Sequence, residues 1–372
     1  MKILFLVARP TQFEAPLFRF AAGGGSGEHT LKPLFWEPRA AAPADDHELD
    51  RRVDWGFDLF AGYPYAIAPA GAGSEWIEAE LDQGCDLLII NGYVSALCRN
   101  AARLARRRGI RSALRLDSVQ FPGDPGPSLA RRLFVRLFLG RRFDRFLGTS
   151  SLTLQYLQSC GVASSRCGLF PYAVDHEHFL AAADRARPRR GEIRRQWGVP
   201  VDARVVLLVS KLHSRETPWD ALRAAAALPA DVHLVLAGDG PERAACEALA
   251  QATPGRRIHF LGYAEYGLLP ELYAAADLFV HVPREERWGV SVAEALATGL
   301  PAVTNTRVGA GIDLIAPGRN GFVVASGSPG ALASAIADAL ALPGAAVAAT
   351  NRERLEPWGY AATWRSLLAA AR

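Results

Sequence analysis

Short apolar runs that alternate with segments of helical period constrain the fold of this chain more than any other feature. The pattern is typical of α/β layering with parallel sheets. In the first half the expected strands are Lys2–Ala8, Leu31–Trp36, Asp86–Asn91, Ser112–Leu116 and Arg145–Ser150. In the second half they are Arg204–Ser210, His233–Ala237, Ile258–Leu261, Leu278–Val282, Ala302–Asn305 and Gly321–Val324. We therefore expect two Rossmann-like domains in tandem, whose sheets face an interdomain cleft.

The length of 372 residues also favours two domains, because one hydrophobic core seldom supports so long a chain. The periodic pattern fades over 171–195, where arginines and prolines cluster, and we expect the linker there. The expected domains are thus 1–172 and 190–352. A helix over 355–372 carries apolar residues that could cover its own domain or the first one, and we predict the first.

Composition narrows the classes of partner. The net charge of +4 is too weak for a general nucleic-acid surface, so anionic small molecules or a membrane surface are better candidates. The five cysteines are scattered, without the paired spacing of a zinc site, and we expect reduced thiols in the cytosol. No apolar run is long and uninterrupted enough to predict a membrane span.

The segment DLFVHVPREERWGVSVAEALATGLPAVTN, residues 277–305, is the most informative. It predicts a strand, a loop, a helix that begins near Gly289 or Val290 and ends at Gly299, and a second strand. In a parallel sheet such a helix starts beside the carboxyl ends of the strands, where its N-H groups favour a phosphate. Gly289 removes a side chain where the ligand would come closest.

Glu286 and Glu294 flank that turn with seven residues between them. Two such glutamates are often only solvated surface residues. A glycosidase pair is another alternative, but it needs carboxylates roughly 5–9.5 Å apart. Eight helical positions rise about 12 Å, which better suits contacts with the two ends of one ligand. A sugar and a ribose joined by two phosphates would have that form.

This segment resembles the E-x7-E motif of the family 4 retaining glycosyltransferases, which have the GT-B fold. It reads Glu286-Arg287-Trp288-Gly289, then Glu294-Ala295-Leu296-Ala297, Gly299 and Pro301. The resemblance is strong over about 165–325 and weak in the first half. Further segments similar to the family are FPYAVDHEHF at 170–179, SKLHSRETPWDALRA at 210–224, LAGDGPER at 236–243, FLGYAEYGLLPELYAAAD at 260–277 and APGRNGFVV at 316–324.

The resemblance implies a role for each matching position. Glu286 would contact hydroxyls of the donor sugar near the reacting centre, and Glu294 the ribose. Lys211 and Arg215 would neutralise the departing diphosphate, because the chain lacks a persuasive D-x-D metal motif and we expect no metal. Asp117 would contact the donor sugar or the acceptor hydroxyl, or merely cap a turn. The remaining donor-binding positions are Gly262, Trp288, Gly289 and Val290.

Two positions depart from the family. Glu216 stands where the family commonly has a second lysine, although Arg215 beside it could replace that cation. The first loop reads TQFEAP at 11–16, where many relatives have a pair of glycines near the donor phosphates.

The sequence thus predicts a retaining, metal-independent glycosyltransferase that has no cofactor and uses a UDP-sugar or GDP-sugar donor. Its acceptor would be a hydroxyl of a glycan, lipid or small molecule. A nucleotide-sugar epimerase and a catalytically degenerate nucleotide-binding protein remain alternatives. The arginine-rich apolar run at 130–146 could touch an anionic membrane, although core packing with an arginine-rich outer face is the explanation that we favour. We expect a cytoplasmic protein that is peripheral to the membrane at most.

Overall fold

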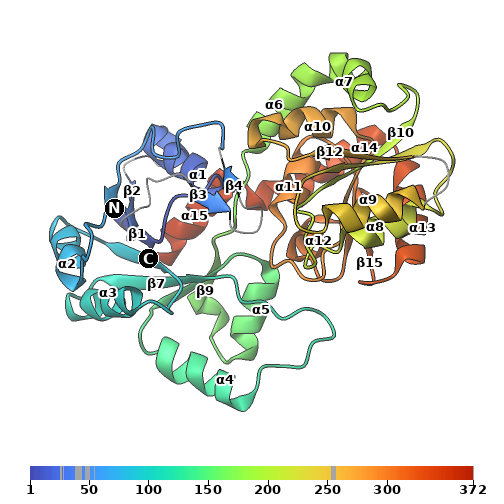
Figure 1. Ribbon diagram of the computed structural model, residues 1–372. Helices are drawn as coiled ribbons and strands as arrows, with labels where there is room; N and C mark the ends of the chain where they lie inside the picture. Colours follow the sequence, from blue (N-terminus) through green and yellow to red (C-terminus); the bar gives the residue numbers. More distant parts are fainter. Residues whose placement is uncertain are drawn as a thin grey trace. The chain divides into compact units, whose positions relative to one another are not determined.

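A computed structural model describes residues 1–25, 27, 29–37, 44–46, 51–53, 55–252 and 257–371. The chain divides into two compact units, each described here by itself (Figure 1). The first unit comprises Met1–Ala42, Phe57–Ala173 and Trp358–Arg372, and the second comprises Pro43–Gly56 and Val174–Pro357.

The first unit is built on a seven-stranded sheet in which every paired strand is parallel. Its order is β5-β2-β1-β6-β7-β8-β9. The bounds in that order are Ala66–Ile67, Thr30–Phe35, Lys2–Val7, Leu87–Asn91, Arg111–Leu116, Arg145–Gly148 and Cys167–Leu169.

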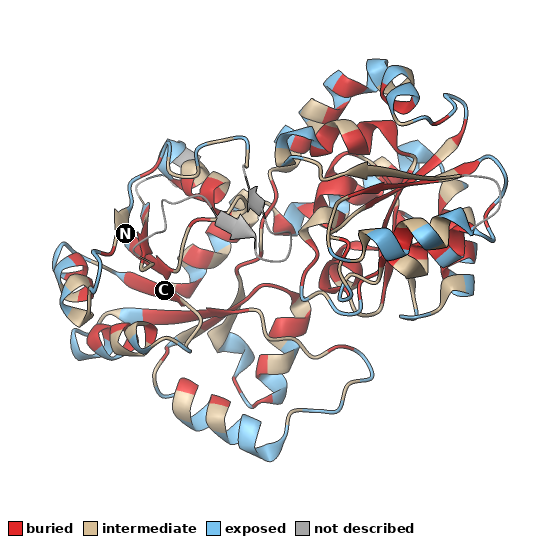
Figure 2. Ribbon diagram, viewed as in Figure 1, coloured by how far each residue is buried: buried red, intermediate tan, exposed pale blue. Residues whose placement is uncertain are grey.

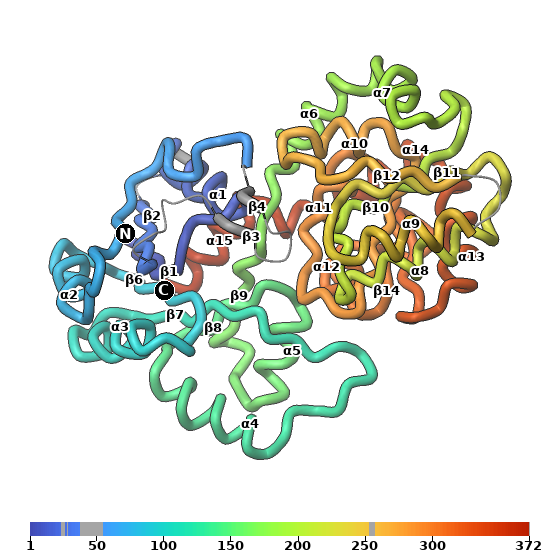
Figure 3. The backbone as a smooth tube through the Cα atoms, in the orientation of Figure 1, coloured from blue at the N-terminus to red at the C-terminus, as the bar shows by residue number. Residues whose placement is uncertain are grey.

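Helices cover both faces of this sheet, and for that reason β1 and β6 are apolar without alternation. Leu4 and Leu6 of β1 belong to one core with Ile77 of α2, whereas Phe5 belongs to the opposite core with Leu367 of α15. The C-terminal helix α15 is thus part of the first unit, beside the N-terminal strand (Figure 3). The helices are α1 Glu14–Phe20, α2 Ser74–Asp82, α3 Ala96–Arg107, α4 Leu129–Leu133, α5 Ser151–Ser159 and α15 Tyr360–Ala370, with π-helical turns η1 Ala21–Gly25 and η2 Phe134–Leu139.

The second unit contains a six-stranded parallel sheet with the order β12-β11-β10-β13-β14-β15. This is the 3-2-1-4-5-6 order of a doubly wound nucleotide-binding fold, so strand order reverses between β10 and β13. The bounds in sheet order are Ile258–Gly262, Val232–Ala237, Arg204–Val209, Leu278–His281, Ala302–Asn305 and Gly321–Val324. A short antiparallel pair, β3 Ala44–Asp46 with β4 Arg51–Val53, is grouped with this unit.

The helices of the second unit pack on both faces of its sheet. Figure 2 shows buried residues concentrated along the strands and on the helix faces turned toward them. A single core joins Val206 of β10 and Val280 of β13 to Leu222 of α8 and Ile336 of α13. The helices are α6 His176–Ala186, α7 Arg190–Gln196, α8 Pro218–Ala225, α9 Arg243–Gln251, α10 Leu269–Ala275, α11 Val290–Ala297, α12 Gly309–Leu314, α13 Pro329–Leu340 and α14 Gly344–Leu355.

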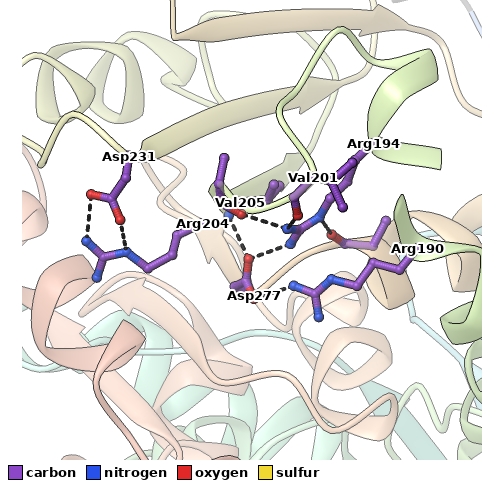
Figure 4. A network of polar contacts seen from close by, with 9 residues as sticks. Arg190, Arg194, Val201, Arg204, Val205, Asp231 and Asp277 are labelled. Carbon is purple, nitrogen blue, oxygen red and sulfur yellow. Dashed lines mark hydrogen bonds and ion pairs between the residues drawn. The ribbon is translucent and has the colours of Figure 1, made fainter. Parts of the chain in front are cut away.

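The arginine cluster that we interpreted as a linker is helical, and it is held by an acidic residue of the second unit (Figure 4). Asp277 precedes β13 and pairs with Arg194 at 2.5 Å and with Arg190. The same carboxylate accepts the N-H of Val205 in β10 at 2.7 Å. Arg194 is only 3% exposed and also donates to the carbonyl of Ala203 at 2.6 Å. These arginines therefore anchor α7 at the amino ends of β10 and β13.

The predicted α/β class with two parallel sheets is confirmed, and all eleven expected strands are present within one or two residues of their expected bounds. The sequence analysis did not predict β3, β4, β5 and β9, which have only two or three residues each and carry little periodic signal. Among the described residues, no single helix is long and apolar enough to cross a membrane. One pair, Pro329–Leu340 with Gly344–Ala370, meets the length and composition test only together and is bent by 107° at its break.

Candidate functional site

The candidate site lies at the carboxyl edge of the second sheet, where strand order reverses between β10 and β13. Ligands of open α/β sheets bind in the crevice outside such a reversal. Lys211 follows β10 directly after Ser210, and Glu286 lies in the loop that follows β13. The fold therefore brings two predicted site residues, 75 positions apart in the sequence, to neighbouring strands at the same edge.

Gly289 forms the turn between that loop and α11. Its φ of +94° lies in the left-handed region, and a Cβ there would be 3.0 Å from Cγ1 of Val308. Any other residue would be both strained and crowded. The helix begins at Val290, and Gly299, with a φ of +89°, follows its C-cap at Thr298. The predicted start and end of this helix are confirmed.

The loop that carries Glu286 is held by backbone hydrogen bonds to the segment after β14. The N-H of Glu286 donates to Arg307 at 2.8 Å, and the N-H of Gly309 donates back to Glu286 at 3.0 Å. Ala310 donates to the carbonyl of Trp288 at 2.6 Å. A Cβ on Gly309 would be 2.2 Å from the Arg287 carbonyl, so only glycine permits this close approach. The position of Glu286 is thus set by the backbone.

The loop after β10 is joined to the same structure. The N-H of Arg284 donates to the carbonyl of Arg215 at 2.8 Å, and the Thr217 hydroxyl donates to Val282 at 2.7 Å. Thr217 has a φ of +41°, the only positive value among the described non-glycine residues. Lys211, Arg215 and Glu286 therefore lie on two loops that are directly hydrogen bonded to each other.

Gly262 ends β12 at the same edge of the sheet. Its carbonyl accepts the N-H of Gly238 at 2.7 Å, and the N-H of Ser210 donates to Ala237 at 3.1 Å. A Cβ on Gly238 would lie 1.8 Å from the Ser210 carbonyl, so the ends of β10 and β11 come together through glycine. The Gly262 backbone is therefore held in register with the loop that carries Lys211.

Glu294 is almost fully buried in α11, with 3% of its surface exposed. The Tyr273 hydroxyl donates to its carboxylate at 3.0 Å. Burial raises the pKa of Glu294 to about 7, although hydrogen bonds from Tyr273 and Tyr266 act in the opposite direction. These tyrosines fix the orientation of the carboxylate, and no sequence pattern indicated that they would contact it.

Glu216, His281 and Glu286 form a second feature of the site. Each offers one ligand atom, and these three atoms lie within 4.8 Å of one another. Burial raises the pKa of Glu216, and the neighbouring Glu286 adds to the effect, while Arg215 and Lys211 oppose it. Burial also lowers the pKa of His281 to about 4, so its ring is neutral at pH 7. A search for a D-x-D motif could not find this group, because Glu216 lies far in the sequence from His281 and Glu286.

Asp117 belongs to the first unit, where it follows β7. Two residues earlier, Arg115 is fully buried and pairs with Glu14, the first residue of α1. Arg115 also donates to the carbonyl of Phe170 at 3.1 Å and lies 4.5 Å from the ring centroid of Tyr172. Glu14 lies within 11–16, which we expected to be a loop, whereas α1 begins there at Glu14. An arginine inside the apolar strand SALRL was the signal for this ion pair, and our sequence interpretation did not use it.

Comparisons with known proteins agree with this geometry. Residues 189–360 match the family model described as "Glycosyl transferases group 1". A GDP-mannose-dependent alpha-mannosyltransferase of Mycobacterium tuberculosis is 35% identical over 228 residues, which cover 60% of this chain and 56% of that protein. The lipopolysaccharide core biosynthesis mannosyltransferase LpsB of Rhizobium meliloti is 30% identical over 218 residues, 54% of this chain and 56% of that protein. The chain thus spans just over half the length of these curated relatives.

Solved GT-B structures match almost the whole chain. The UDP complex of HepE from Anabaena has a TM-score of 0.73 at 18% identity and covers 99% of this chain and 98% of that one. A glycosyltransferase from Rickettsia africae has a TM-score of 0.76 at 14% identity, with 99% and 96% covered. At these identities the likeness shows the fold alone. Residues 189–360 therefore match the group 1 glycosyl transferases, in a chain that has the GT-B fold.

Proposed function

We propose that this protein is a retaining glycosyltransferase that moves a sugar from a nucleotide-sugar donor to a hydroxyl acceptor. One observation carries the proposal. The E-x7-E segment forms a glycine turn and a helix start at the point where strand order reverses in the second sheet. The loop of this segment is hydrogen bonded to the loop that contains Lys211 and Arg215. The helix start supplies N-H groups to a phosphate, and the two cations offset the charge of the leaving group. The family match over the same residues supports this assignment.

In this proposal Glu286 accepts hydrogen bonds from hydroxyls of the donor sugar, and Glu294 accepts those of the ribose. The bond between the sugar and the diphosphate oxygen breaks, and the acceptor oxygen forms a bond to the same face of the anomeric carbon. The departing phosphate oxygen takes the acceptor proton, so the nucleoside diphosphate leaves with that proton. Trp288, Gly289, Val290 and Gly262 shape the donor site, and Asp117 contacts the donor sugar or the acceptor.

The donor in this proposal is a UDP-sugar or GDP-sugar. The names of two curated relatives specify GDP-mannose, and HepE of Anabaena was solved with UDP and with UDP-glucose. Other relatives are named for D-inositol 3-phosphate or for a phosphatidylinositol dimannoside. Those names support a glycan, lipid or small-molecule acceptor, and they do not choose among the three.

A peripheral contact with an anionic membrane is part of the proposal. Leu129, Leu133 and Leu137 recur every four residues along α4 and η2, and they are 72%, 47% and 46% exposed. Arg131, Arg132 and Arg136 lie among them, as in basic amphipathic helices at membrane surfaces. We also propose a cytoplasmic location, supported by the five cysteines, all of which are free. Flotation with anionic and neutral vesicles would separate membrane contact from ordinary surface packing.

The test is a panel of UDP- and GDP-sugars with hydroxyl acceptors, in which released nucleoside diphosphate is measured and the anomeric configuration of the product is read by NMR. We expect release that depends on an acceptor, with retention. Conversion of the donor without an acceptor would instead indicate an epimerase. Nucleotide binding without turnover of any pair would indicate a degenerate binding protein. The same assay, run with and without a chelator, tests the sequence-based prediction that the reaction is metal-independent.

A further inference from the structure

Glu216 is negatively charged at a position where the family resemblance leads us to expect a positively charged lysine. A glutamate in place of a lysine changes the formal charge at that position by two negative units. Glu216 lies in the loop between β10 and α8, close enough to Lys211 and Arg215 for their charges to act on it. The two carboxylates Glu216 and Glu286 then cancel the formal charge of those two cations. A diphosphate arriving here would find no net positive charge among these four side chains.

The same glutamate completes a set of cation ligands. A carboxylate oxygen of Glu216, one of Glu286 and a ring nitrogen of His281 all lie within 4.8 Å of one another. Ligand atoms bound to one ion at about 2.1 Å can be separated by up to about 4.2 Å, so a small side-chain adjustment would close the group. The Ser210 hydroxyl lies 3.4 Å from a carboxylate oxygen of Glu216 and also contacts the carbonyl of Lys211 at 2.9 Å.

His281 provides an independent reason to look for a ligand here. It is the last residue of β13, 5% exposed, and its Nε2 atom is buried without a hydrogen-bond partner in the described part of the chain. A buried polar atom without a partner costs roughly 1–3 kcal/mol, so native structures seldom leave one unsatisfied. The ring is also next to Gly289, whose added Cβ would be 3.6 Å from His281 Cδ2. The imidazole thus belongs to the turn at which the donor phosphates are proposed to bind.

We propose that Glu216, His281 and Glu286 bind a divalent cation of the Mn²⁺ or Zn²⁺ class. Two carboxylates and an imidazole suit such ions and leave coordination positions open for phosphate oxygens or water. Two positive charges equal the charge that the lysine-to-glutamate replacement removes, so the cation would restore the neutralisation of the donor diphosphate. This role in donor binding rests on the proposed function, whereas the cation site itself does not.

The first experiment is calorimetric titration of Mn²⁺ into the 372-residue protein after removal of metals with a chelator. We expect one Mn²⁺ per chain, with affinity that increases in the presence of UDP or GDP. Glu216→Gln should weaken Mn²⁺ binding by at least about tenfold, since even changes outside the ligand set cost 10–100-fold. Glu192→Gln, an exposed glutamate of α7, is the matched control and should bind Mn²⁺ as the wild type does.

The second experiment restores the lysine. Glu216→Lys should lose Mn²⁺ binding but keep nucleoside-diphosphate binding in the presence of EDTA, whereas the wild type should need the metal for full affinity. The proposal is overturned if the wild type binds no Mn²⁺, or if Glu216→Gln and the control bind it equally. Nucleotide binding that is unaffected by Mn²⁺ would reject the role of the cation in donor binding and leave the proposed function intact. If Mn²⁺ binding depends on Glu216 but the protein binds no nucleotide, the cation site is supported and the proposed function is rejected.

Discussion

The hydroxyl of Tyr273 donates a 3.0 Å hydrogen bond to the carboxylate of Glu294 inside the second unit. Glu294 is the second glutamate of the E-x7-E segment, and Tyr273 comes from α10, the helix before β13. The proposed ribose contact is therefore pre-oriented by a residue outside the motif. A fixed carboxylate loses less conformational entropy when it binds a hydroxyl than a mobile one does.

Tyr273→Phe should reveal that relationship. Loss of the donated hydrogen bond to a buried carboxylate should cost about 1–3 kcal/mol of unfolding free energy. It should also weaken UDP or GDP binding, because Glu294 loses part of its orientation. Denaturant unfolding and calorimetry measure the two effects, and Tyr65→Phe, at a ring that is 41% exposed in the first unit, is the control. Unchanged stability and affinity in Tyr273→Phe would contradict this role.

The pKa of Glu294, raised by burial to about 7, predicts a pH-dependent stability. A raised acid pKa favours the protonated form in the folded state, so its stabilising contribution is complete below the unfolded pKa of about 4.5. That contribution is lost as pH rises through about 7, and a shift of this size corresponds to something on the order of 3 kcal/mol.

Glu294→Gln cannot ionise and should lack this loss. The difference in melting temperature between Glu294→Gln and the wild type should therefore move in favour of the variant between pH 5 and pH 8. A difference that stays constant over that range would show that Glu294 titrates near its ordinary value.

Gly289→Ala tests the turn itself. Its φ of +94° and the 3.0 Å approach of Val308 to an added Cβ predict a cost of about 1–3 kcal/mol, together with a clear loss of nucleotide affinity. Gly330→Ala is the control, because this glycine lies in α13 with negative φ and open space around its Cβ position. We expect that control to be neutral or slightly stabilising. Equal behaviour of the two variants would argue against a special turn at Gly289.

Lys211→Ala and Glu286→Gln should affect different steps. Lys211→Ala should weaken nucleoside-diphosphate binding and lower turnover together. The Lys211 ammonium would contact the diphosphate both in the bound donor and in the departing nucleoside diphosphate. Glu286→Gln should lower turnover by about 100-fold or more, with nucleotide affinity in the presence of a chelator near that of the wild type. Steady-state kinetics and calorimetry separate these patterns, and near-normal rates in Glu286→Gln would remove its assigned role.

The sequence predicted the strands, the helix start at Gly289 and the carboxyl-edge location of Lys211 and Glu286, because each depends on local patterns. Apolar runs set the strands, and glycines mark turns in which φ is positive. The hydrogen bonds that fix these parts, such as Arg284 to Arg215 and Gly309 to Glu286, join segments far apart in the chain, and no local pattern encodes them.

The features that the sequence interpretation missed all depend on contacts between a polar side chain and a partner far away in the sequence. We predicted the linker over 171–195, and the boundary between the two units falls within it, after Ala173. Composition does not show that Asp277, more than 80 positions after Arg194, binds the arginines at the end of that range. His281 and Arg115 are polar residues within apolar strand runs, and this was the available signal for both. Such residues need a partner when buried, and the partner can be identified only after the fold has brought other segments beside them.

The most direct test of the central claim is a crystal structure of the protein soaked with UDP or GDP. We expect a diphosphate at the start of α11 beside Gly289, within reach of Lys211, with the ribose hydroxyls toward Glu294. A nucleotide bound elsewhere, with the turn at Gly289 vacant, would contradict it.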